Sequence, residues 1–252
     1  MSSTAALRPP TGTLVVTDDV AATFADAVAD ALENRPGEVF SLALSGGPTA
    51  MRCYERLREL SVPGPAPGSV PGSVPGSSRV LDWSRVDVYF GDERCVDPSE
   101  EASNLRAARE ALLDHVGQLH SVNPMYTGGD ITRAAELYHE LVAGIRRFDL
   151  VHLGLGPDGH TASLFAGSPA LEEPGDRLCM PSSDPSGRNP YTRLTLTLPA
   201  LSRAAIAVFT VSGVEKRAAF SALCSGEDLP AARVRARRTV WIVDPDALGS
   251  SG

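Results

Sequence analysis

The sequence predicts an α/β fold, a doubly wound and mainly parallel sheet with helices on both faces. Short apolar runs alternate along the chain with longer segments of helical periodicity. Most of the apolar runs are continuous, which is typical of strands buried on both faces of a parallel sheet. The length of 252 residues suffices for one sizeable core and is marginal for two. We therefore expect one domain over residues 1–252.

The predicted elements follow this alternation in order. The first strand covers residues 13–17, and an alanine-rich amphipathic helix follows at residues 20–34. The remaining strands are expected at residues 39–44, 86–90, 150–154, 193–197, 205–211 and 239–243. The remaining helices are expected at residues 48–60, 103–116, 131–146 and 214–224, with a short one at residues 159–165.

Residues 62–78 interrupt the pattern with the sequence VPGPAPGSVPGSVPGSS. This segment has too few apolar side chains to pack, so it is predicted to be a mobile surface loop. It can also be read as a linker between two domains. The helix before it and the strand after it fit one continuing alternation better.

Composition narrows the classes of partner. The hydrophobic share of 42% and charged share of 21% are those of a globular protein. A formal charge of −8 gives no general attraction to nucleic acid, and no basic stripe offsets it. No apolar run is long enough for a signal peptide or a membrane span, so we expect a cytoplasmic protein without nucleic-acid or membrane partners.

The cysteines are widely separated and form no C-x-x-C pair, which indicates neither a zinc site nor a disulfide framework. We expect them to be small buried or half-buried residues in a reducing compartment. They are Cys53, Cys95, Cys179 and Cys224.

Chemistry-bearing residues follow three predicted strands, at the edge where an open parallel sheet binds ligands. In LALSGGPTA, Ser45, Gly46, Gly47 and Thr49 lie between a strand and a helix that begins near Pro48. Glycines let the backbone approach an anion, and the free N–H groups of a helix start point toward it. The segment can hold a phosphate, or it can be a tight turn with a hydroxyl cap.

In VDVYFGDER, Asp92, Glu93 and Arg94 follow Gly91 at the end of a strand. Three such charges either serve a site or form a solvated loop with a local ion pair. Asn104 lies next to a predicted helix start, where it can contact a ligand or cap the helix. The residues alone leave both alternatives open.

The segment FDLVHLGLGPDGHTASLF places His160 after a glycine-rich turn, with Asp158 two positions earlier. Histidine titrates near neutral pH, and the aspartate can orient the ring or stabilise its cation. The pattern predicts a general base. The other histidines lack close spacing for a metal site and are predicted to be structural or solvated; they are His115, His120, His139 and His152.

Two cationic positions complete the candidate set. Arg193, in NPYTRLTLTLP, either reaches a substrate or faces water from an edge strand. Lys216, in VSGVEKRAAF, is the only lysine of the chain and follows an apolar strand. Because a retained lysine among so many arginines suggests a specific use, we predict that Lys216 binds phosphate.

The segments SGGPT, GDER followed by SN, GLGPDGHTASLF and SGVEK occur in the order and approximate spacing of 6-phosphogluconolactonases. The chain resembles that family over nearly its whole length. The resemblance implies the fold of glucosamine-6-phosphate deaminase, ribose-5-phosphate isomerase and CoA transferase. It also implies hydrolysis of 6-phospho-D-glucono-1,5-lactone to 6-phospho-D-gluconate, the second step of the oxidative pentose phosphate pathway, with no metal or organic cofactor.

By the same resemblance, the loop of Ser45, Gly46, Gly47 and Thr49 is the phosphate cradle, Lys216 is a further phosphate partner, and Arg94 and His160 are the catalytic pair. Asp92, Glu93, Asn104 and Arg193 are the further candidates for substrate binding. The family usually reads Ser-Gly-Gly-Ser-Thr-Pro, whereas this chain has Pro48 in the fourth place and Ala50 in the sixth, so one backbone donor is missing. Ala166 replaces a frequent proline.

The expected mechanism is addition of water to the lactone carbonyl, with His160 as general base and Asp158 holding its ring. Arg94 or backbone N–H groups would stabilise the oxyanion. Two alternatives remain. The related deaminases usually carry a glutamate five residues after the shared histidine, where this chain has Phe165. A non-enzymatic sugar-phosphate sensor usually carries a helix-turn-helix segment, for which we find no spare length.

Overall fold

The computed structural model describes residues 8–35, 39–61 and 81–249, so the predicted loop at residues 62–78 lies outside the described residues. The helices are α1 (Val20–Glu33), α2 (Pro48–Ser61), α3 (Asn104–Ala108), α4 (Ile131–Gly144), α5 (Leu198–Ser202), α6 (Arg217–Cys224) and α7 (Pro245–Leu248). The strands are β1 (Thr13–Val16), β2 (Phe40–Leu44), β3 (Val86–Phe90), β4 (Asp92–Arg94), β5 (Ser121–Val122), β6 (Leu150–Gly154), β7 (Cys179–Ser182), β8 (Arg193–Leu196), β9 (Ile206–Val211) and β10 (Arg238–Val243).

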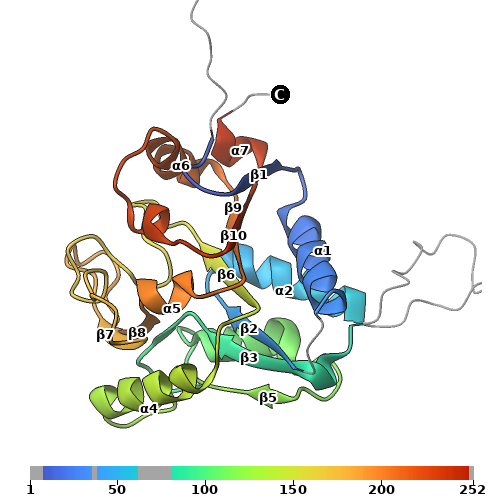
Figure 1. The fold of residues 1–252 in the computed structure, drawn as a ribbon, viewed down its shortest axis with the longest axis vertical. Helices are drawn as coiled ribbons and strands as arrows, with labels where there is room; N and C mark the ends of the chain where they lie inside the picture. Colours follow the sequence, from blue (N-terminus) through green and yellow to red (C-terminus); the bar gives the residue numbers. More distant parts are fainter. Residues whose placement is uncertain (1–7, 36–38, 62–80, 250–252) are drawn as a thin grey trace, which may run out of the picture.

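Seven strands form one sheet in the order β1-β10-β9-β6-β2-β3-β5, and every neighbouring pair is parallel. Helices α1 and α2 cover one side of it, while α4 and α5 lie toward the other (Figure 1). The predicted α/β sheet is therefore confirmed. After β2 the chain continues outward to β3 and β5, and after β6 it continues outward to β9 and β10. The crevice between β2 and β6 is thus a topological switch point, where such sheets bind ligands.

Residues 193–197 are not part of the parallel sheet, contrary to the simple alternation that the sequence predicts. β8 pairs antiparallel with β4 and with β7 in a separate three-stranded sheet. Gly91 alone separates β3 from β4. Its N–H donates to the Leu44 carbonyl at 2.8 Å, and its carbonyl accepts from the Leu196 N–H at 2.8 Å. One residue therefore joins the two sheets.

The predicted helix at residues 159–165 is wrong. This segment forms turns with an isolated bridge between Thr161 and Leu164. Gly159 has a φ of +83° and Ala162 a φ of +49°, and such left-handed residues cannot continue a right-handed helix. The helix predicted at residues 103–116 is divided in two. Its first part is α3, and a π-helical stretch follows directly at Arg109–Leu113. The predicted helix at 214–224 begins as a 3₁₀ turn at Val214–Lys216 before α6.

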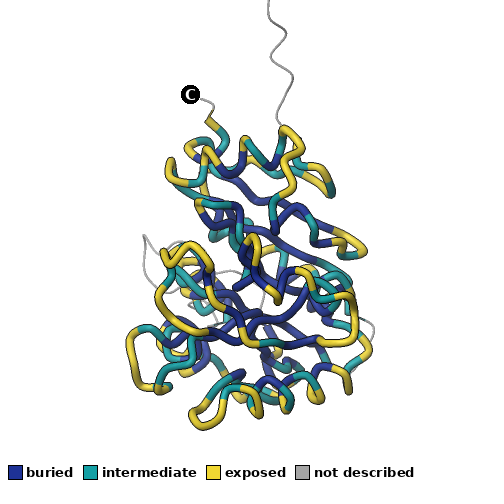
Figure 2. The backbone as a smooth tube through the Cα atoms, turned by 90° about the vertical axis from the view of Figure 1, so that its left-hand side faces the viewer, coloured by how far each residue is buried: buried dark blue, intermediate teal, exposed yellow. Residues whose placement is uncertain are grey.

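Buried apolar side chains from both sides of the sheet form one contiguous cluster. In Figure 2 the buried stretches run through the middle of the molecule and the exposed ones lie on the outer turns. In α1, Phe24, Val28 and Leu32 face this core, and the Asp19 carboxylate caps the helix start by accepting from the Ala22 N–H at 2.9 Å. Within the described residues, no helix is long and apolar enough to cross a bilayer.

Candidate active site

A pocket of about 330 Å³ opens at the carboxyl ends of β2, β6 and β9, against the small sheet. Most of the candidate residues named from the sequence line it. They are Ser45, Gly46, Gly47, Thr49, Asp92, Arg94, Asn104, His160, Arg193 and Lys216. Asp158 and Glu93 are the two candidates that do not line the pocket wall.

The loop after β2 presents unused backbone donors to this pocket. Among the described residues, the N–H groups of Gly46, Gly47, Thr49 and Ala50 have no protein acceptor. Gly47 has a φ of +93°, which a side chain would disfavour. The α2 helix starts at Pro48, so its positive dipole end adds to the donors. Free N–H groups at a helix start can hold an anion.

Asn104 closes one side of this loop. A methyl group on Gly46 would lie 2.1 Å from Asn104 Oδ1, so no side chain fits at position 46. The Asn104 amide donates to the Asp92 carbonyl at 2.9 Å and to Asp92 Oδ1 at 3.2 Å. Asn104 is therefore held between the β2 loop and β4. The N-cap of α3 is its neighbour Ser103, so Asn104 is not a plain cap.

Glu93 does not line the pocket, contrary to what its prediction as a substrate-binding residue leads one to expect. The side chain is buried and accepts from the N–H groups of Asn104 at 2.7 Å and Leu105 at 2.8 Å. Burial raises the pKa of Glu93, while these donors oppose that shift. The carboxylate instead fixes the start of α3, which positions Asn104.

The His160 ring lies over the pocket in an orientation set by Asp158. His160 Nδ1 lies 2.5 Å from Asp158 Oδ1, and the His160 N–H donates to the same oxygen at 3.2 Å. The hydrogen bond from His160 lowers the pKa of Asp158, which keeps it a carboxylate. With Nδ1 donating to a carboxylate, Nε2 is left as the proton acceptor. The Phe165 ring packs on the imidazole at 4.8 Å between centroids.

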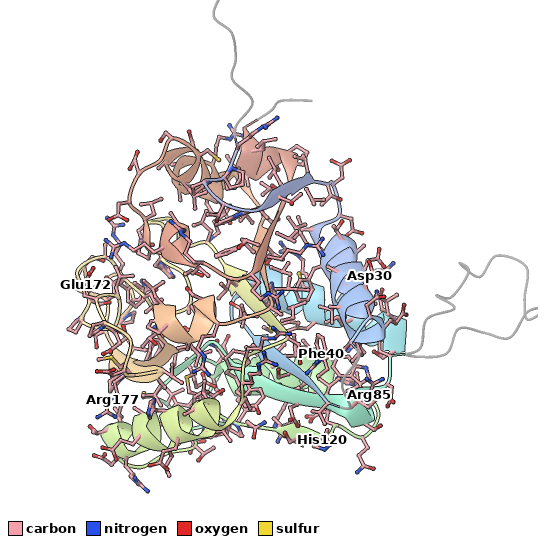
Figure 3. The ribbon with its side chains drawn as sticks, in the orientation of Figure 1. Asp30, Phe40, Arg85, His120, Glu172 and Arg177 are labelled. Atoms are coloured by element: carbon pink, nitrogen blue, oxygen red, sulfur yellow. The ribbon has the colours of Figure 1, made fainter. Side chains whose placement is uncertain are left out.

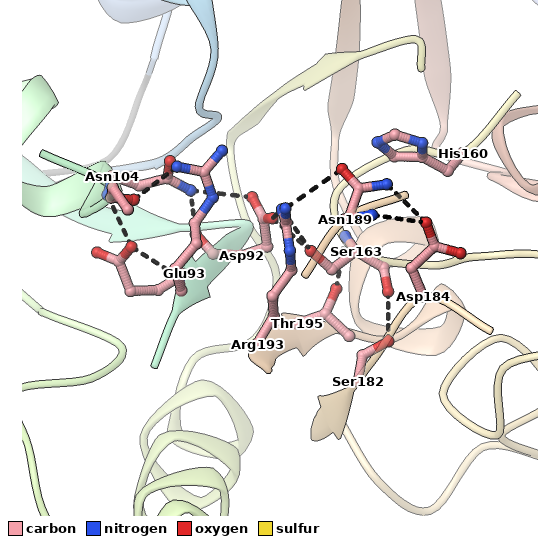
Figure 4. Close-up of polar contacts among 12 residues, drawn as sticks. Asp92, Glu93, Asn104, His160, Ser163, Ser182, Asp184, Asn189, Arg193 and Thr195 are labelled. Atoms are coloured by element: carbon pink, nitrogen blue, oxygen red, sulfur yellow. Dashed lines mark hydrogen bonds and ion pairs between the residues drawn. The ribbon is translucent and has the colours of Figure 1, made fainter. Parts of the chain in front are cut away.

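Arg193 comes from β8 into the floor of the pocket, where it pairs with Asp92 (Figure 4). The two atoms Arg193 Nη1 and Asp92 Oδ2 are 3.4 Å apart, and the side chains are only 7% and 6% exposed. The Ser163 hydroxyl donates to the same Asp92 oxygen at 2.5 Å. Burial lowers the pKa of Arg193, and the charge of Asp92 opposes that shift. The alternative of an edge-strand charge facing water is therefore wrong.

Three buried polar atoms of residues that line the pocket have no hydrogen-bond partner among the described residues. They are Arg94 Nε, Arg193 Nε and Thr161 Oγ1. Arg94 is otherwise held by one bond from Nη1 to the Ala102 carbonyl at 2.6 Å. An unpaired buried polar group costs about 1–3 kcal/mol, so a ligand that contacts these three atoms in the pocket would remove that cost.

The pocket rests on a buried polar chain that starts at Tyr54. The Tyr54 hydroxyl accepts from the Ser45 N–H at 2.7 Å and donates to the Ser45 carbonyl at 3.0 Å. It also lies 2.9 Å from His152 Nδ1, and His152 Nε2 lies 2.8 Å from Thr210 Oγ1. Burial lowers the pKa of His152 to about 3, so the ring is neutral and structural. Tyr54 and His152 thus link Ser45 to Thr210, and both of these end residues line the pocket.

The other histidines lie away from the pocket. His120 is at the outer edge of the large sheet, where its Nδ1 is 2.6 Å from Asp87 Oδ1 (Figure 3). His139 Nδ1 accepts from the Leu178 N–H at 3.1 Å, and His115 is exposed. Within the described part of the chain, no three His, Cys, Asp or Glu side chains gather in a way that could hold a metal ion. All four cysteines are free thiols, two of them buried.

The sequence and the fold are both similar to those of known proteins. The family model described as glucosamine-6-phosphate isomerases/6-phosphogluconolactonase matches residues 14–241. This chain belongs to that family. It is 39% identical over 184 residues to a 6-phosphogluconolactonase of Mycobacterium tuberculosis, covering 66% of this chain and 74% of the relative. It is 33% identical over 222 residues to one of Synechocystis, covering 82% of each chain.

Solved structures agree with the family assignment. The 6-phosphogluconolactonase of Thermotoga maritima superposes with a TM-score of 0.76 at 28% identity, over 93% of this chain and all of that one. A monomeric glucosamine-6-phosphate deaminase superposes with a TM-score of 0.75 at 17% identity and shares the fold.

For this member of the glucosamine-6-phosphate isomerase/6-phosphogluconolactonase family, sequence reasoning missed several polar residues of the pocket. Arg52 lies three residues after Thr49, on the same face of α2, and that spacing was the available signal. Thr210 is the last residue but one of the apolar strand β9, where a hydroxyl is unremarkable. Asn189 comes from an irregular segment before β8, and no pattern marks it. The missed residues are Arg52, Asn189, Thr210 and Glu215.

Proposed function

We propose that this chain hydrolyses 6-phospho-D-glucono-1,5-lactone to 6-phospho-D-gluconate. The observation that carries the proposal is the pairing, in one pocket, of a histidine with a carboxylate-bound Nδ1 and a row of free backbone N–H groups. The N–H groups suit a phosphate, and the histidine suits a general base. Relatives with this family's sequence pattern carry the name 6-phosphogluconolactonase.

In the proposed reaction the phosphate binds at the Ser45 to Thr49 loop and Lys216, which brings the lactone carbonyl toward His160. His160 Nε2 takes a proton from water while the water oxygen bonds to the carbonyl carbon. Arg94 stabilises the negative charge that develops on the carbonyl oxygen. The bond from that carbon to the ring oxygen then breaks, and His160 returns its proton to the ring oxygen, leaving the acid, which ionises.

Phe165 bears on the alternative of a deaminase. Its ring packs against the His160 ring, so the position five residues after the histidine supplies an apolar contact instead of a carboxylate. Lactone hydrolysis uses a single acid/base group, whereas moving protons between carbons of an aminosugar requires more. We therefore favour the lactonase reaction. A cytoplasmic location, a single domain over residues 1–252 and the absence of a nucleic-acid partner belong to the same proposal.

The test is hydrolysis of freshly generated 6-phospho-D-glucono-1,5-lactone above its spontaneous rate, with a chelator present. We expect acceleration by the native protein and a loss of about 10²- to 10⁴-fold in His160→Ala. His115→Ala is the matched control, because His115 is exposed and lies outside the pocket lining. Consumption of glucosamine-6-phosphate without lactone hydrolysis would favour the deaminase. Binding of sugar phosphate with neither reaction would favour a sensor.

A further inference from the structure

Pro48 interrupts the row of backbone donors that faces the pocket. The free N–H groups belong to residues on both sides of it, Gly46, Gly47, Thr49 and Ala50. Proline has no N–H group, so position 48 offers an anion no donor. The favourable effect of proline on a helix start does not replace that donor. An anion in this loop therefore receives no backbone hydrogen bond from position 48.

Arg52 lies one helical turn further along α2 and lines the same pocket. Its Nη2 lies 3.5 Å from Thr49 Oγ1 and 3.3 Å from Ser212 Oγ. Thr49 belongs to the cradle, and Ser212 precedes the turn that carries Lys216. The guanidinium thus spans the two segments that flank the proposed phosphate position.

The contacts of Arg52 leave most of its donors unused. Both of its hydrogen bonds are long and come from one nitrogen, whereas a guanidinium carries five N–H groups. Among the described residues, no carboxylate pairs with Arg52 or with Lys216. By contrast Arg56, one turn later on α2, lies 2.5 Å from Glu59 and is outside the pocket lining.

The Ser212 hydroxyl gives Arg52 a fixed point. It donates to Asp244 Oδ2 at 2.7 Å, and the same carboxylate accepts from the Gly213 N–H at 2.9 Å. Because the Ser212 proton is committed to Asp244, its oxygen is left to accept from Arg52. The guanidinium is thereby held at the pocket without being neutralised by the distant carboxylate.

We propose that Arg52 binds the substrate phosphate and supplies the donor that Pro48 withholds. This inference rests on the proposed function, whose phosphate site it completes. A planar guanidinium matches two phosphate oxygens at once, which a single backbone N–H cannot do. Arg52 therefore determines specificity for the phosphorylated over the unphosphorylated lactone, and takes no part in proton transfer.

The first test compares Arg52→Ala with Arg56→Ala, an equal loss of charge on the same helix. Arg52→Ala is expected to raise KM for the phosphorylated lactone and Kd for inorganic phosphate by about 10- to 100-fold, the factor for one or two charge-assisted hydrogen bonds. We expect kcat to change less than about twofold and hydrolysis of glucono-1,5-lactone to be unchanged. Arg56→Ala should alter none of these quantities.

The second test restores the missing donor. In the Pro48→Ser background, where position 48 has an N–H group, Arg52→Ala should cost a smaller factor in Kd for inorganic phosphate than in the native background. Equal factors in the two backgrounds would refute the compensation. An unchanged Kd in Arg52→Ala, or equal losses on both lactones, would refute the phosphate contact.

Titration calorimetry with inorganic phosphate keeps the two proposals separable. Arg52-dependent phosphate binding without lactone hydrolysis by the native protein would uphold this inference and refute the lactonase. Lactone hydrolysis by the native protein, together with an equal Kd for inorganic phosphate in the native protein and Arg52→Ala, would uphold the lactonase and refute this inference. Melting temperatures of all variants identify any that fail to fold, and Arg52→Lys, which keeps the charge but loses the planar fork, should recover only part of the affinity.

Discussion

Tyr54 binds both backbone groups of Ser45 through one hydroxyl, which lies 2.7 Å from the Ser45 nitrogen and 3.0 Å from its carbonyl oxygen. Tyr138 does the same for Phe90, with distances of 2.8 Å and 3.2 Å. Both tyrosines are buried, and they come from helices α2 and α4. The two tyrosine hydroxyls thus fix the carboxyl ends of β2 and β3, where the hydrogen bonds of the parallel sheet end.

We expect Tyr54→Phe to weaken phosphate binding as well as stability, because it leaves the Ser45 N–H and carbonyl buried without partners. The free energy of unfolding should fall by about 1–3 kcal/mol, and KM for the phosphorylated lactone should rise. Tyr138→Phe is the matched control, with a similar loss of stability but no change in Kd for inorganic phosphate. Equal effects of the two variants on that Kd would contradict a positioning role for Tyr54. Urea unfolding and steady-state kinetics supply the measurements.

Asp158→Asn tests the orientation of the His160 ring, the proposed general base. The amide oxygen is uncharged and accepts from Nδ1–H more weakly than a carboxylate does, and the amide NH2 can donate to Nδ1 instead, so the tautomer with a free Nε2 loses its support. We expect kcat to fall about 10²- to 10⁴-fold while Kd for inorganic phosphate stays within about twofold. Activity of the variant near the native value would show that another group holds the ring.

Gly156→Ala tests the packing that lets His160 reach the pocket. A methyl group there would lie 2.1 Å from His160 Nδ1 and 2.7 Å from Asp158 Oδ1, so the pair must separate. We expect a loss of activity comparable with that of Asp158→Asn. Gly144→Ala, at the end of α4, meets nothing within 4 Å and should retain full activity. A fully active Gly156→Ala would mean that the ring can move without loss of function.

His152 should make stability depend on pH. Its pKa falls from 6.5 to about 3 on burial, so between these values the unfolded chain binds a proton that the folded chain excludes. Acid therefore favours unfolding, and the stability present above pH 6.5 is lost as the pH falls toward 3. The slope from one proton is about 1.4 kcal/mol per pH unit.

The measurement is urea unfolding at several pH values in this window for the native protein and His152→Asn. Carboxylates contribute alike to both proteins, so the difference between the two slopes isolates the histidine. We expect the variant to be less stable at neutral pH but to lose stability less steeply in acid. Identical slopes would contradict the burial of a neutral ring.

Six strands of the large sheet were predictable from the sequence because they are largely apolar runs, such as FSLAL in β2 and IAVFTV in β9. The seventh, β5, has only two residues, Ser121 and Val122, and was not predicted. The small sheet was not predictable, since β4 reads Asp-Glu-Arg and carries no apolar pattern. Its pairing partners lie about a hundred residues away, and local propensity does not encode such long-range contacts. The helix predicted at residues 159–165 fails because Ala162 adopts a left-handed conformation that only its surroundings impose.

Glycine-rich turns and a lone lysine were strong signals for the pocket because they follow strand ends. Charge alone was a weak one. Glu93 and Asp92 are neighbours in sequence, yet Glu93 accepts backbone N–H groups of α3 while Asp92 borders the pocket. Arg52 is one of many arginines, and only the positions of Thr49 and Ser212 distinguish it. Such differences arise from tertiary geometry, which residue type does not specify.

Gly91 connects the seven-stranded sheet to the three-stranded sheet, and both sheets contribute residues to the candidate active site. His160 and the cradle follow strands of the seven-stranded sheet, whereas Asp92, Arg94 and Arg193 belong to the three-stranded one. Seven of the ten described strands belong to the larger sheet, but the proposed reaction requires the smaller sheet to stay in place against it. On heating, activity should therefore be lost before secondary structure is lost. A ligand that contacts residues of both sheets should delay the loss of activity more than it delays unfolding.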